Sequence, residues 1–191
     1  MTGPRTAGVE AWDLPFDGEA VLDTAKRLGA EDAEVYFESS RQTRLKVYGG
    51  KLESMVLARE KGVGVRVFVG ARMGFSYSSD LSAAALQAAV EEAMANAGVS
   101  DADELNFLPD PAEQYPEVEI FDEALSAVTT DEKVALALEI ERMALDADPR
   151  IKRVPETEYS DTDRRVFLLN TRGLRGSYRS TVCGASVWLV A

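Results

Sequence analysis

The stretch from residue 51 to residue 69 alternates regularly between two kinds of side chain, and it constrains the fold more than any other feature of the sequence. In its second part a valine stands at every other position from 63 to 69, with Gly64, Arg66 and Phe68 between them. A period of two residues is that of a β-strand, which sets one face against a core and the other toward water. We therefore expect strands here, separated by a turn at Gly62.

The same alternation recurs along the chain and predicts a sheet built from hairpins. Gly49-Gly50 and Gly70-Ala71-Arg72 carry the small, permissive residues that tight hairpin turns require. Further strands are expected at residues 33–38, 45–47, 73–78, 151–159, 166–169 and from 174 to the end of the chain.

Two helices are expected from apolar residues at helical spacing and from residues that cap helix ends. Asp17 is a suitable N-cap for the first helix, and Gly29 stands just past its end. The second helix begins near Asp80 or Ser82 and ends at Gly98.

A third helix is expected from Thr129 to about Ala147. Thr129 and Glu132 have the spacing of a capping box. Apolar residues then cover a wide arc of this helix, so we expect it to be covered on more than one side.

Together these elements predict an α+β fold, with mostly antiparallel sheets and helices packed on one face. We expect a flexible leader at residues 1–16 and a domain at 17–191. Within that domain a first unit at about 17–98 and a second at about 129–191 are joined by a proline-rich linker at about 99–128.

The two units also resemble each other, which predicts an internal duplication. When Leu52 is placed on Leu174, Val65 falls on Val187 and Gly62 on Gly184 without a gap. Each half then reads as a helix followed by three strands, and the duplication would give two similar hairpin sheets. The last residues have the pattern of an apolar strand, and no turn or polar residues follow it. We therefore expect the chain to be a piece of a longer protein, cut within a strand.

Composition excludes several classes of function. The formal net charge of −12 argues against a nucleic-acid partner, which requires a basic face. The sequence contains no histidine, which removes histidine-based catalysis and every histidine-ligated metal site. One cysteine, no membrane-length apolar run and no signal peptide favour a cytoplasmic protein without a membrane partner.

Several short motifs have both a functional and a structural interpretation. The glycines of residues 62–64 and 70–74 lack the pattern of phosphate-binding loops, and we expect them to serve hairpins. The serines at 76, 78 and 79 precede Asp80, and without a histidine we expect helix capping rather than a hydrolase nucleophile. Cys183 lies in an alternating strand, where we expect it to pack as a small apolar residue.

Charged and aromatic residues leave further alternatives open. An all-carboxylate metal site is conceivable, although we favour solvated acidic loops. A cluster of arginines is weak evidence for an acidic partner surface, and two tyrosines could line a groove, although strand aromatics are usually packing residues. These residues are Asp101, Asp103, Glu104, Asp161 and Asp163; Arg164, Arg165, Arg172, Arg175 and Arg179; and Tyr36 and Tyr48.

A series of short motifs follows one another along the chain: AEVY at 33–36, GKLES at 50–54, GVGVRV at 62–67, GFSYSSDL at 74–81, ADPRI at 147–151, NTRGL at 170–174 and GSY at 176–178. In this order and spacing they resemble the N-terminal domain of the TldD/PmbA family, whose members were once called modulators of DNA gyrase. The resemblance covers about residues 17 to 191 and is nearer to the PmbA branch, also called TldE.

The resemblance implies an N-terminal scaffold and pairing domain in a subunit of a cytoplasmic peptidase complex that acts on unfolded peptides. Its implied partner is a homologous TldD-like subunit or a second copy of itself, and its sheet edges could hold an extended peptide. TldD-like members carry a metal-binding His-Glu-x-x-x-His helix in their C-terminal half, so a zinc-type metal is expected only there. No catalytic, metal-binding or cofactor-binding residue is carried over to this chain, and we expect it to be inactive alone. The alternative is a freestanding acidic interaction module without a peptidase connection.

Overall fold

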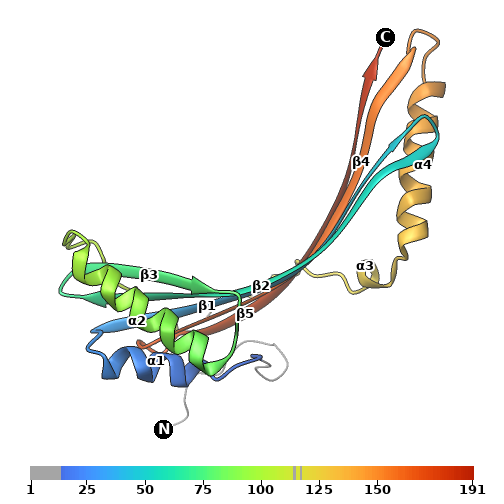
Figure 1. Ribbon diagram of the computed structural model, residues 1–191. Coiled ribbons are helices and arrows are strands. Elements are labelled where there is room, and N and C mark those ends of the chain that lie inside the picture. Colours follow the sequence, from blue (N-terminus) through green and yellow to red (C-terminus); the bar gives the residue numbers. More distant parts are fainter. Residues whose placement is uncertain (1–13, 114, 117) are drawn as a thin grey trace. The chain divides into compact units, whose positions relative to one another are not determined.

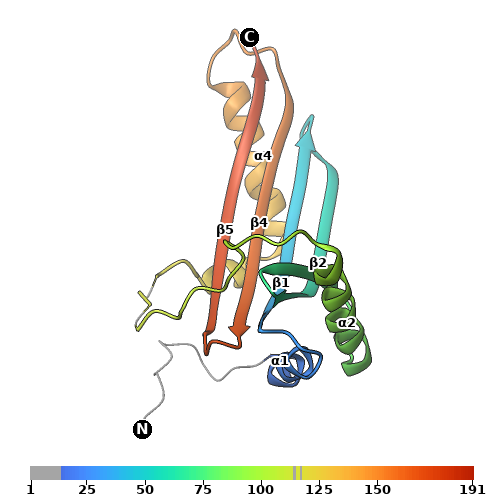
Figure 2. The ribbon, with the colours of Figure 1, turned by 90° about the vertical axis from the view of Figure 1, so that its left-hand side faces the viewer.

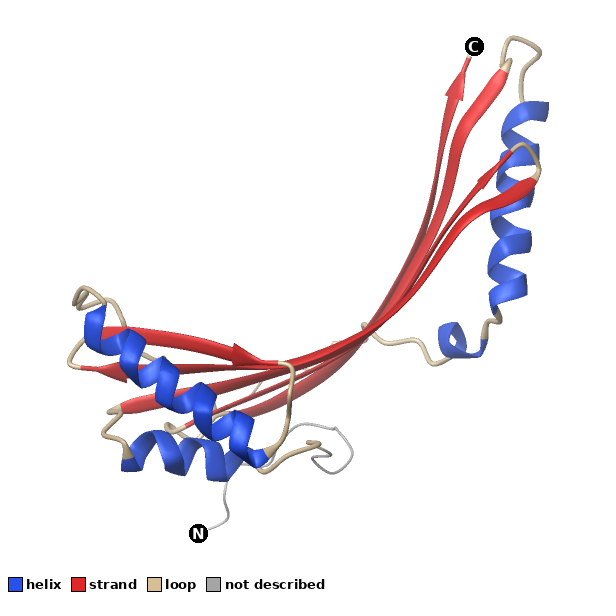
Figure 3. Cartoon of the chain, viewed as in Figure 1, coloured by secondary structure: helices blue, strands red, loops and turns tan. Residues whose placement is uncertain are grey.

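The computed structural model describes residues 14–113, 115–116 and 118–191. Among these residues, five strands form one antiparallel sheet in the order β3-β2-β1-β4-β5 (Figures 1 and 3). The predicted α+β class is therefore confirmed. The elements are α1 (Gly18–Arg27), β1 (Asp32–Tyr48), β2 (Lys51–Val69), β3 (Arg72–Ser78), α2 (Ala83–Val99), α3 (Ala124–Ala127), α4 (Thr130–Asp146), β4 (Arg153–Asn170) and β5 (Arg175–Val190).

The three long helices begin at the residues that the sequence predicted. The side chains of Asp17 and Ser82 accept hydrogen bonds from backbone N–H groups three residues further on, at 3.0 and 3.4 Å. At α4, Thr129 accepts from the N–H of Glu132, whose carboxylate accepts in return from the N–H of Thr129 at 2.7 Å. These caps give partners to N–H groups that a helix leaves unsatisfied.

The hairpin turns at Gly49-Gly50 and at residues 70–72 are also where the sequence placed them. Gly49 and Gly50 have φ angles of 61° and 71°, and Gly70 and Ala71 have 55° and 60°. Two successive positive φ angles suit a two-residue hairpin turn. The second turn closes the pairing of Val69 with Arg72, from which β2 and β3 stay in register to residues 63 and 78. In Figure 2, β4 and β5 lie side by side as a further hairpin.

The strands are longer and fewer than the sequence predicted. The separate strands expected at 33–38 and 45–47 are one strand, β1, and those expected at 151–159 and 166–169 are one strand, β4. The turn expected at Gly62 is wrong, because β2 runs through it. Both β1 and β4 have a strand neighbour on each side. Backbone hydrogen bonds to two neighbours hold polar stretches extended, whatever their side-chain pattern.

The first of two compact units contains the described residues of 14–39, 61–119 and 165–178. In this unit α1 and α2 pack on the same face of the sheet (Figures 1 and 3). Of the alternating valines of β2, Val63, Val65 and Val67 are buried, as predicted, and Val69 is partly buried. The core includes Val21, Leu22 and Ala25 of α1; Val35 and Phe37 of β1; Val63, Val65 and Val67 of β2; Leu86, Ala89, Val90, Ala93 and Ala97 of α2; and Phe167 and Leu169 of β4.

Helix α2 approaches β3 so closely that one position accepts only glycine. A Cβ added to Gly74 would lie 1.9 Å from the carbonyl oxygen of Ala93. Such a contact is far inside the packing distance of a carbon and an oxygen, so the helix would have to move. The glycine interpreted from sequence as a hairpin residue is therefore a packing residue.

The predicted leader and linker are only partly surface segments. Residues 1–13 of the expected leader lie outside the described residues, but Leu14 and Phe16 pack on the first core, with the Phe16 ring 5.7 Å from that of Phe37. In the linker, Leu108 is fully buried, and the short helix α3 was not predicted.

The second unit contains residues 40–60, 120–164 and 179–191. Its core is smaller and consists of Leu45, Val47, Ala137 and Tyr159, with Val134 and Leu138 packed against them. The buried stripe of α4 is Lys133, Ala137 and Glu141, so two of its three members are charged.

Polar contacts therefore tie α4 to the sheet. The carboxylate of Glu141 accepts hydrogen bonds from the N–H groups of Gly49 and Gly50, at 2.7 and 2.8 Å. Leu136, Met143 and Leu145 are exposed. The expectation that this helix is covered on more than one side is thus wrong for the described residues.

The predicted duplication does not hold in its details. The second half has a helix followed by two strands, because β4 replaces two of the expected three. All strands also belong to one sheet rather than two. A common origin of the two halves stays a prediction. No helix among the described residues is both long and apolar enough to span a lipid bilayer.

Candidate functional site

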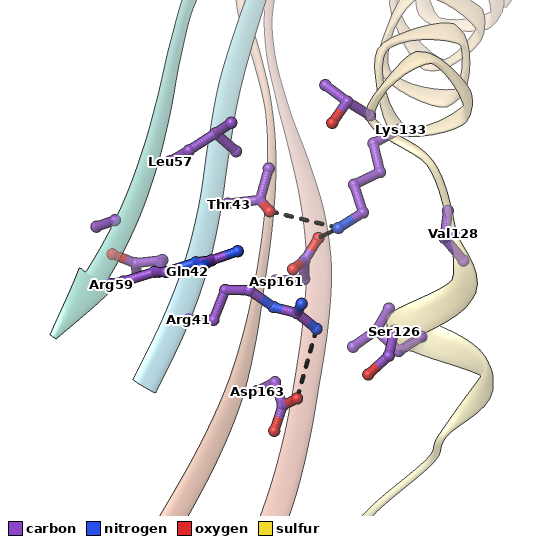
Figure 4. A pocket seen from close by; sticks show the side chains of 13 residues that line it. Arg41, Gln42, Thr43, Leu57, Arg59, Ser126, Val128, Lys133, Asp161 and Asp163 are labelled. Carbon is purple, nitrogen blue, oxygen red and sulfur yellow. Dashed lines mark hydrogen bonds and ion pairs between the residues drawn. The ribbon is translucent and has the colours of Figure 1, made fainter. Parts of the chain in front are cut away.

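A pocket in the second unit brings charged side chains together beside apolar ones (Figure 4). Its volume is about 470 Å³, within the range of small-molecule and peptide side-chain sites. It lies between the sheet and the segment that leads from α3 into α4. The lining residues are Arg41, Gln42 and Thr43 of β1; Leu57, Ala58 and Arg59 of β2; Leu125, Ser126, Val128 and Thr130 near the helices; Lys133 of α4; and Asp161 and Asp163 of β4.

A buried ion pair forms the back of this pocket. Lys133 Nζ lies 2.6 Å from Asp161 Oδ2, and the two side chains are only 10% and 9% exposed. Lys133 Nζ also donates to the hydroxyl of Thr43 at 3.3 Å. The contact with Asp161 is an ion pair without hydrogen-bond alignment, because among the described residues no donor meets Oδ2 in good geometry. This carboxylate oxygen is closed off from solvent, so the ion pair is part of the wall of the pocket.

Tyr159 holds the same carboxylate from the core side. Burial raises the pKa of Tyr159, and a hydrogen bond to Asp161 and the charge of that carboxylate raise this pKa further. The phenol therefore keeps its proton and serves as a donor to Asp161.

Asp163 lies between two arginines at the side of the pocket. Its Oδ2 is 3.5 Å from Arg41 and 3.2 Å from Arg179. The guanidinium of Arg179 also lies 3.9 Å from the ring centre of Phe121, at cation–π distance. These contacts fix the carboxylate and Arg179, while Arg41 stays half exposed and faces the pocket.

The pocket has the chemistry of a binding site. Its hydroxyls come from Thr43, Ser126 and Thr130, and none has a histidine partner, because the sequence contains none. Lys133 and Asp161 are engaged with each other. Polar groups of both signs beside apolar side chains suit recognition of an amphiphilic ligand.

The structure places the predicted carboxylates differently from the sequence. Asp161 and Asp163 lie in β4 and pair with cations, so the interpretation as a solvated acidic loop is wrong for them. Asp101, Asp103 and Glu104 are exposed in the irregular segment after α2, where the Asp103 carboxylate accepts from the N–H of Leu105.

The serines near α2 have structural contacts. Ser78 and Asp80 bond to each other in the turn before the helix, and Asp80 accepts from the N–H of Ser82, which is the N-cap. Ser76 is buried and donates to Glu92 at 2.6 Å, so its expected role in capping is wrong.

Cys183 is exposed on β5, so the expectation that it packs as a small apolar residue is wrong for the described chain. The tyrosines do not share a groove: Tyr36 donates to Glu38 in the first unit, and Tyr48 is exposed in the second.

The predicted arginine cluster is spread over internal ion pairs. Arg172 contacts Asp32 and Asp110, and Arg175 contacts Glu19 at 2.6 Å. With Arg179 held by Asp163, these side chains do not form a free basic surface.

The described residues do not fit a metal centre. In the part of the chain that the structure covers, no three cysteine, aspartate or glutamate side chains gather closely enough to hold an ion. No step of a reaction is therefore assigned to a metal held by these residues.

Sequence reasoning missed the pocket because it treated α4 as an apolar helix. The signal was present: Lys133 and Glu141 stand eight residues apart on one face, and Thr43 and Asp161 occupy strand positions in phase with buried neighbours. Polar residues in phase with a core mark a buried polar contact.

Comparison with known proteins finds matches over most of the chain. Residues 33–97 match "PmbA/TldA metallopeptidase domain 1", and residues 123–191 match "PmbA/TldA metallopeptidase central domain". The chain is 31% identical over 135 residues to a metalloprotease PmbA homolog of Haemophilus influenzae, a match that covers 69% of this chain and 29% of that protein. It is 23% identical over 160 residues to a metalloprotease TldD homolog of the same organism, covering 80% of this chain and 32% of that protein.

The fold is likewise similar to a solved structure. TldE from Thermococcus kodakarensis superposes with a TM-score of 0.80 at 17% identity, over 90% of this chain and 38% of that one. The chain thus spans about a third of the length of the relatives that it matches.

Proposed function

Because the chain belongs to the TldD/PmbA family of metallopeptidase-related proteins, we propose that it is the scaffold and pairing part of a subunit in a cytoplasmic peptidase complex that acts on unfolded peptides. In this proposal the chain itself holds no catalytic residue and no resident metal. Titration with zinc tests this part, since tight stoichiometric binding would contradict it. The family match disfavours the alternative of an interaction module unrelated to peptidases.

The observation that carries the proposal is the outer edge of β5, the last strand of the sheet. The N–H of Thr181 donates outward to Ile120, whereas the carbonyl of Val190 accepts from Lys152 at the start of β4. Backbone groups alternate in direction along a strand, so those of the odd residues 183–189 point away from β4. Among the described residues this row has no strand neighbour.

The side chains of this edge are apolar and exposed. No charged residue occurs from position 180 to 191, and Val182 and Trp188 are each 66% exposed. Val187, Leu189 and Val190 are exposed as well. Proteins usually protect an edge strand with charges, prolines or a cover, because an open apolar edge pairs with other chains. We therefore propose that another segment covers this edge, and in this proposal that segment belongs to a partner subunit.

The partner in this proposal is a homologous TldD-like subunit. Relatives named PmbA and TldD both match this chain, so in this proposal such a subunit presents a similar edge strand. Two copies of this chain would instead bring together two net charges of −12, which disfavours self-association.

Analytical ultracentrifugation of the chain alone and mixed with a TldD-like subunit tests the pairing. We expect a one-to-one complex with the TldD-like subunit, and Leu189→Lys should weaken it at least tenfold by placing a charge at the edge. Gln87→Lys adds the same charge to an exposed site of the first unit and should leave the complex intact. Equal binding by both variants, or a stable dimer of the chain alone, contradicts the assignment.

The opposite edge of the second unit supports a role in holding an extended peptide. Strand β3 pairs only with residues 63–69 of β2, so residues 51–60 have no strand on that side among the described residues. This edge carries Lys51, Glu53, Arg59 and Glu60. Charged side chains on an edge strand oppose stable pairing with another sheet, but they still allow a peptide to bind transiently as an added strand.

Proline substitution tests peptide binding at this edge. Successive N–H groups of a strand point to opposite sides, so only one of residues 56 and 57 has an N–H that points outward from this edge. Of the variants Val56→Pro and Leu57→Pro, the one that removes this outward N–H should stay folded, and that variant is used in the test. It should lose binding of an unfolded peptide, whereas Ala102→Pro in the segment after α2 should not. Unchanged binding by the folded edge variant refutes this role.

A further inference from the structure

We infer that the pocket of the second unit binds the C-terminal carboxylate of an extended peptide together with its last apolar side chain. This inference rests on the proposed function, and it adds a site and a preferred peptide end. The argument starts from the charges that the pocket leaves free (Figure 4).

The positive charges of the pocket exceed its negative charges. Lys133 is neutralised by Asp161, and Asp163 is shared by Arg41 and Arg179. Arg59 lies within ion-pair distance of no carboxylate among the described residues. Arg41 is 49% exposed and reaches its carboxylate only at 3.5 Å. Two guanidinium groups on neighbouring strands are thus available to an anion, in a protein whose net charge is −12.

A carboxylate is the anion that suits this pair. The planar donors of a guanidinium match the two oxygens of a carboxylate, and two arginines can hold both oxygens. The lining side chains beside them include Leu57, which is largely exposed, and Val128. A ligand that combines a carboxylate with an apolar group would engage both.

The carboxylate of Asp161 takes no part in this recognition, because its Oδ2 is closed off from solvent and lies 2.6 Å from Lys133 Nζ. A fatty acid also offers a carboxylate and an apolar group, but it has no backbone N–H and C=O groups that could pair with an open strand edge.

The pocket also adjoins the edge assigned to the peptide. Leu57, Ala58 and Arg59 line the pocket and belong to the part of β2 that, among the described residues, has no strand on its β3 side. A peptide that adds to this edge and ends near Arg59 would place its C-terminus at the pocket. The strand addition then supplies affinity, and the pocket selects chain ends over internal segments.

Fluorescence anisotropy with two peptides tests the inference on the full 191-residue chain. One probe is an unstructured octapeptide with N-terminal fluorescein, a last residue of leucine and a free carboxylate; the other is the same peptide with a C-terminal amide. We expect the amide to bind about tenfold more weakly. Arg59→Ala should weaken the free acid to the level of the amide and leave the amide unchanged, and Arg41→Ala should act in the same direction.

Arg44→Ala is the matched control, because Arg44 lies on the same strand as Arg41, is 52% exposed and does not line the pocket. This variant should bind both peptides as the unmodified chain does. Equal affinity of the unmodified chain for acid and amide overturns the carboxylate site and leaves the proposed edge binding intact. If neither peptide binds, the peptide role of the edge is overturned together with the site.

Discussion

Replacing Lys133 by methionine should strongly destabilise the second unit. The ion pair of Lys133 with Asp161 is about nine-tenths buried, and the methionine would leave the carboxylate without its cation. Removing one partner of a buried pair typically costs about 3–5 kcal/mol, because the other charge stays desolvated. Tyr159 still donates to Asp161, so we expect a loss of about 3 kcal/mol. This is a large part of the stability of an ordinary domain.

The double variant Lys133→Met/Asp161→Leu separates the pair from its surroundings. With both charges replaced by apolar groups, no uncompensated charge remains, and the free energy of unfolding should return to within about 1 kcal/mol of the unmodified chain. Asp161→Leu alone should be destabilising, because it leaves Lys133 Nζ with only the Thr43 hydroxyl. The three variants form a double-mutant cycle whose coupling energy measures the pair.

Urea denaturation followed by far-ultraviolet circular dichroism measures these changes. Arg142→Met is the matched control, because Arg142 also pairs with carboxylates on α4 but is 60% exposed. Its midpoint should stay close to that of the unmodified chain. A loss for Lys133→Met no larger than for Arg142→Met would refute the reasoning. The reasoning would also be refuted if the double variant lost as much free energy of unfolding as the two single variants lose together.

Three further predictions concern other contacts of the fold. Glu141→Gln removes the negative charge that holds both N–H groups of the β1–β2 turn, and urea unfolding should show a loss of about 1–2 kcal/mol. Gly74→Ala should cost about 2 kcal/mol or more in the same assay, because its Cβ would overlap a backbone oxygen of α2, while Gly176→Ala, which has open space, should cost much less. Burial raises the pKa of Asp32, but hydrogen bonds from Arg172 and a threonine, with the charge of that arginine, outweigh it and lower the pKa overall. A carboxyl group whose pKa is lower in the folded chain stabilises the fold at pH values above its unfolded pKa of about 3.9. This stabilisation is lost as the pH falls through the folded pKa. The difference in urea midpoint between the unmodified chain and Arg172→Leu should therefore shrink below about pH 4.

The elements that the sequence predicted correctly are those set by local interactions. The caps at Asp17 and Thr129 and the positive φ angles at Gly49-Gly50 involve residues within three or four positions of each other. Such contacts form whatever the rest of the chain does. The buried face of β2 was likewise visible, because an alternating strand beside a core has only one apolar side.

The candidate site was not predictable in the same way, because its contacts join distant parts of the chain. Lys133 meets Asp161 and Thr43 only when α4 packs on the sheet, and Glu141 meets the β1–β2 turn by the same packing. In the sequence alone these side chains look like ordinary surface charges. Their burial depends on which strands lie in the centre of the sheet.

The sequence by itself determined the class of the fold, the helix starts, the turns with two successive positive φ angles and the lack of histidine chemistry in this chain. These follow from side-chain periodicity, backbone sterics and composition, which need no knowledge of neighbours. Only the tertiary structure decided that the polar middles of β1 and β4 stay extended, that α4 buries charges while exposing leucines, and that β5 has an open apolar edge among the residues the structure describes. Each of these depends on strand order and on helix packing, which set the hydrogen-bond partners and the water access of every side chain.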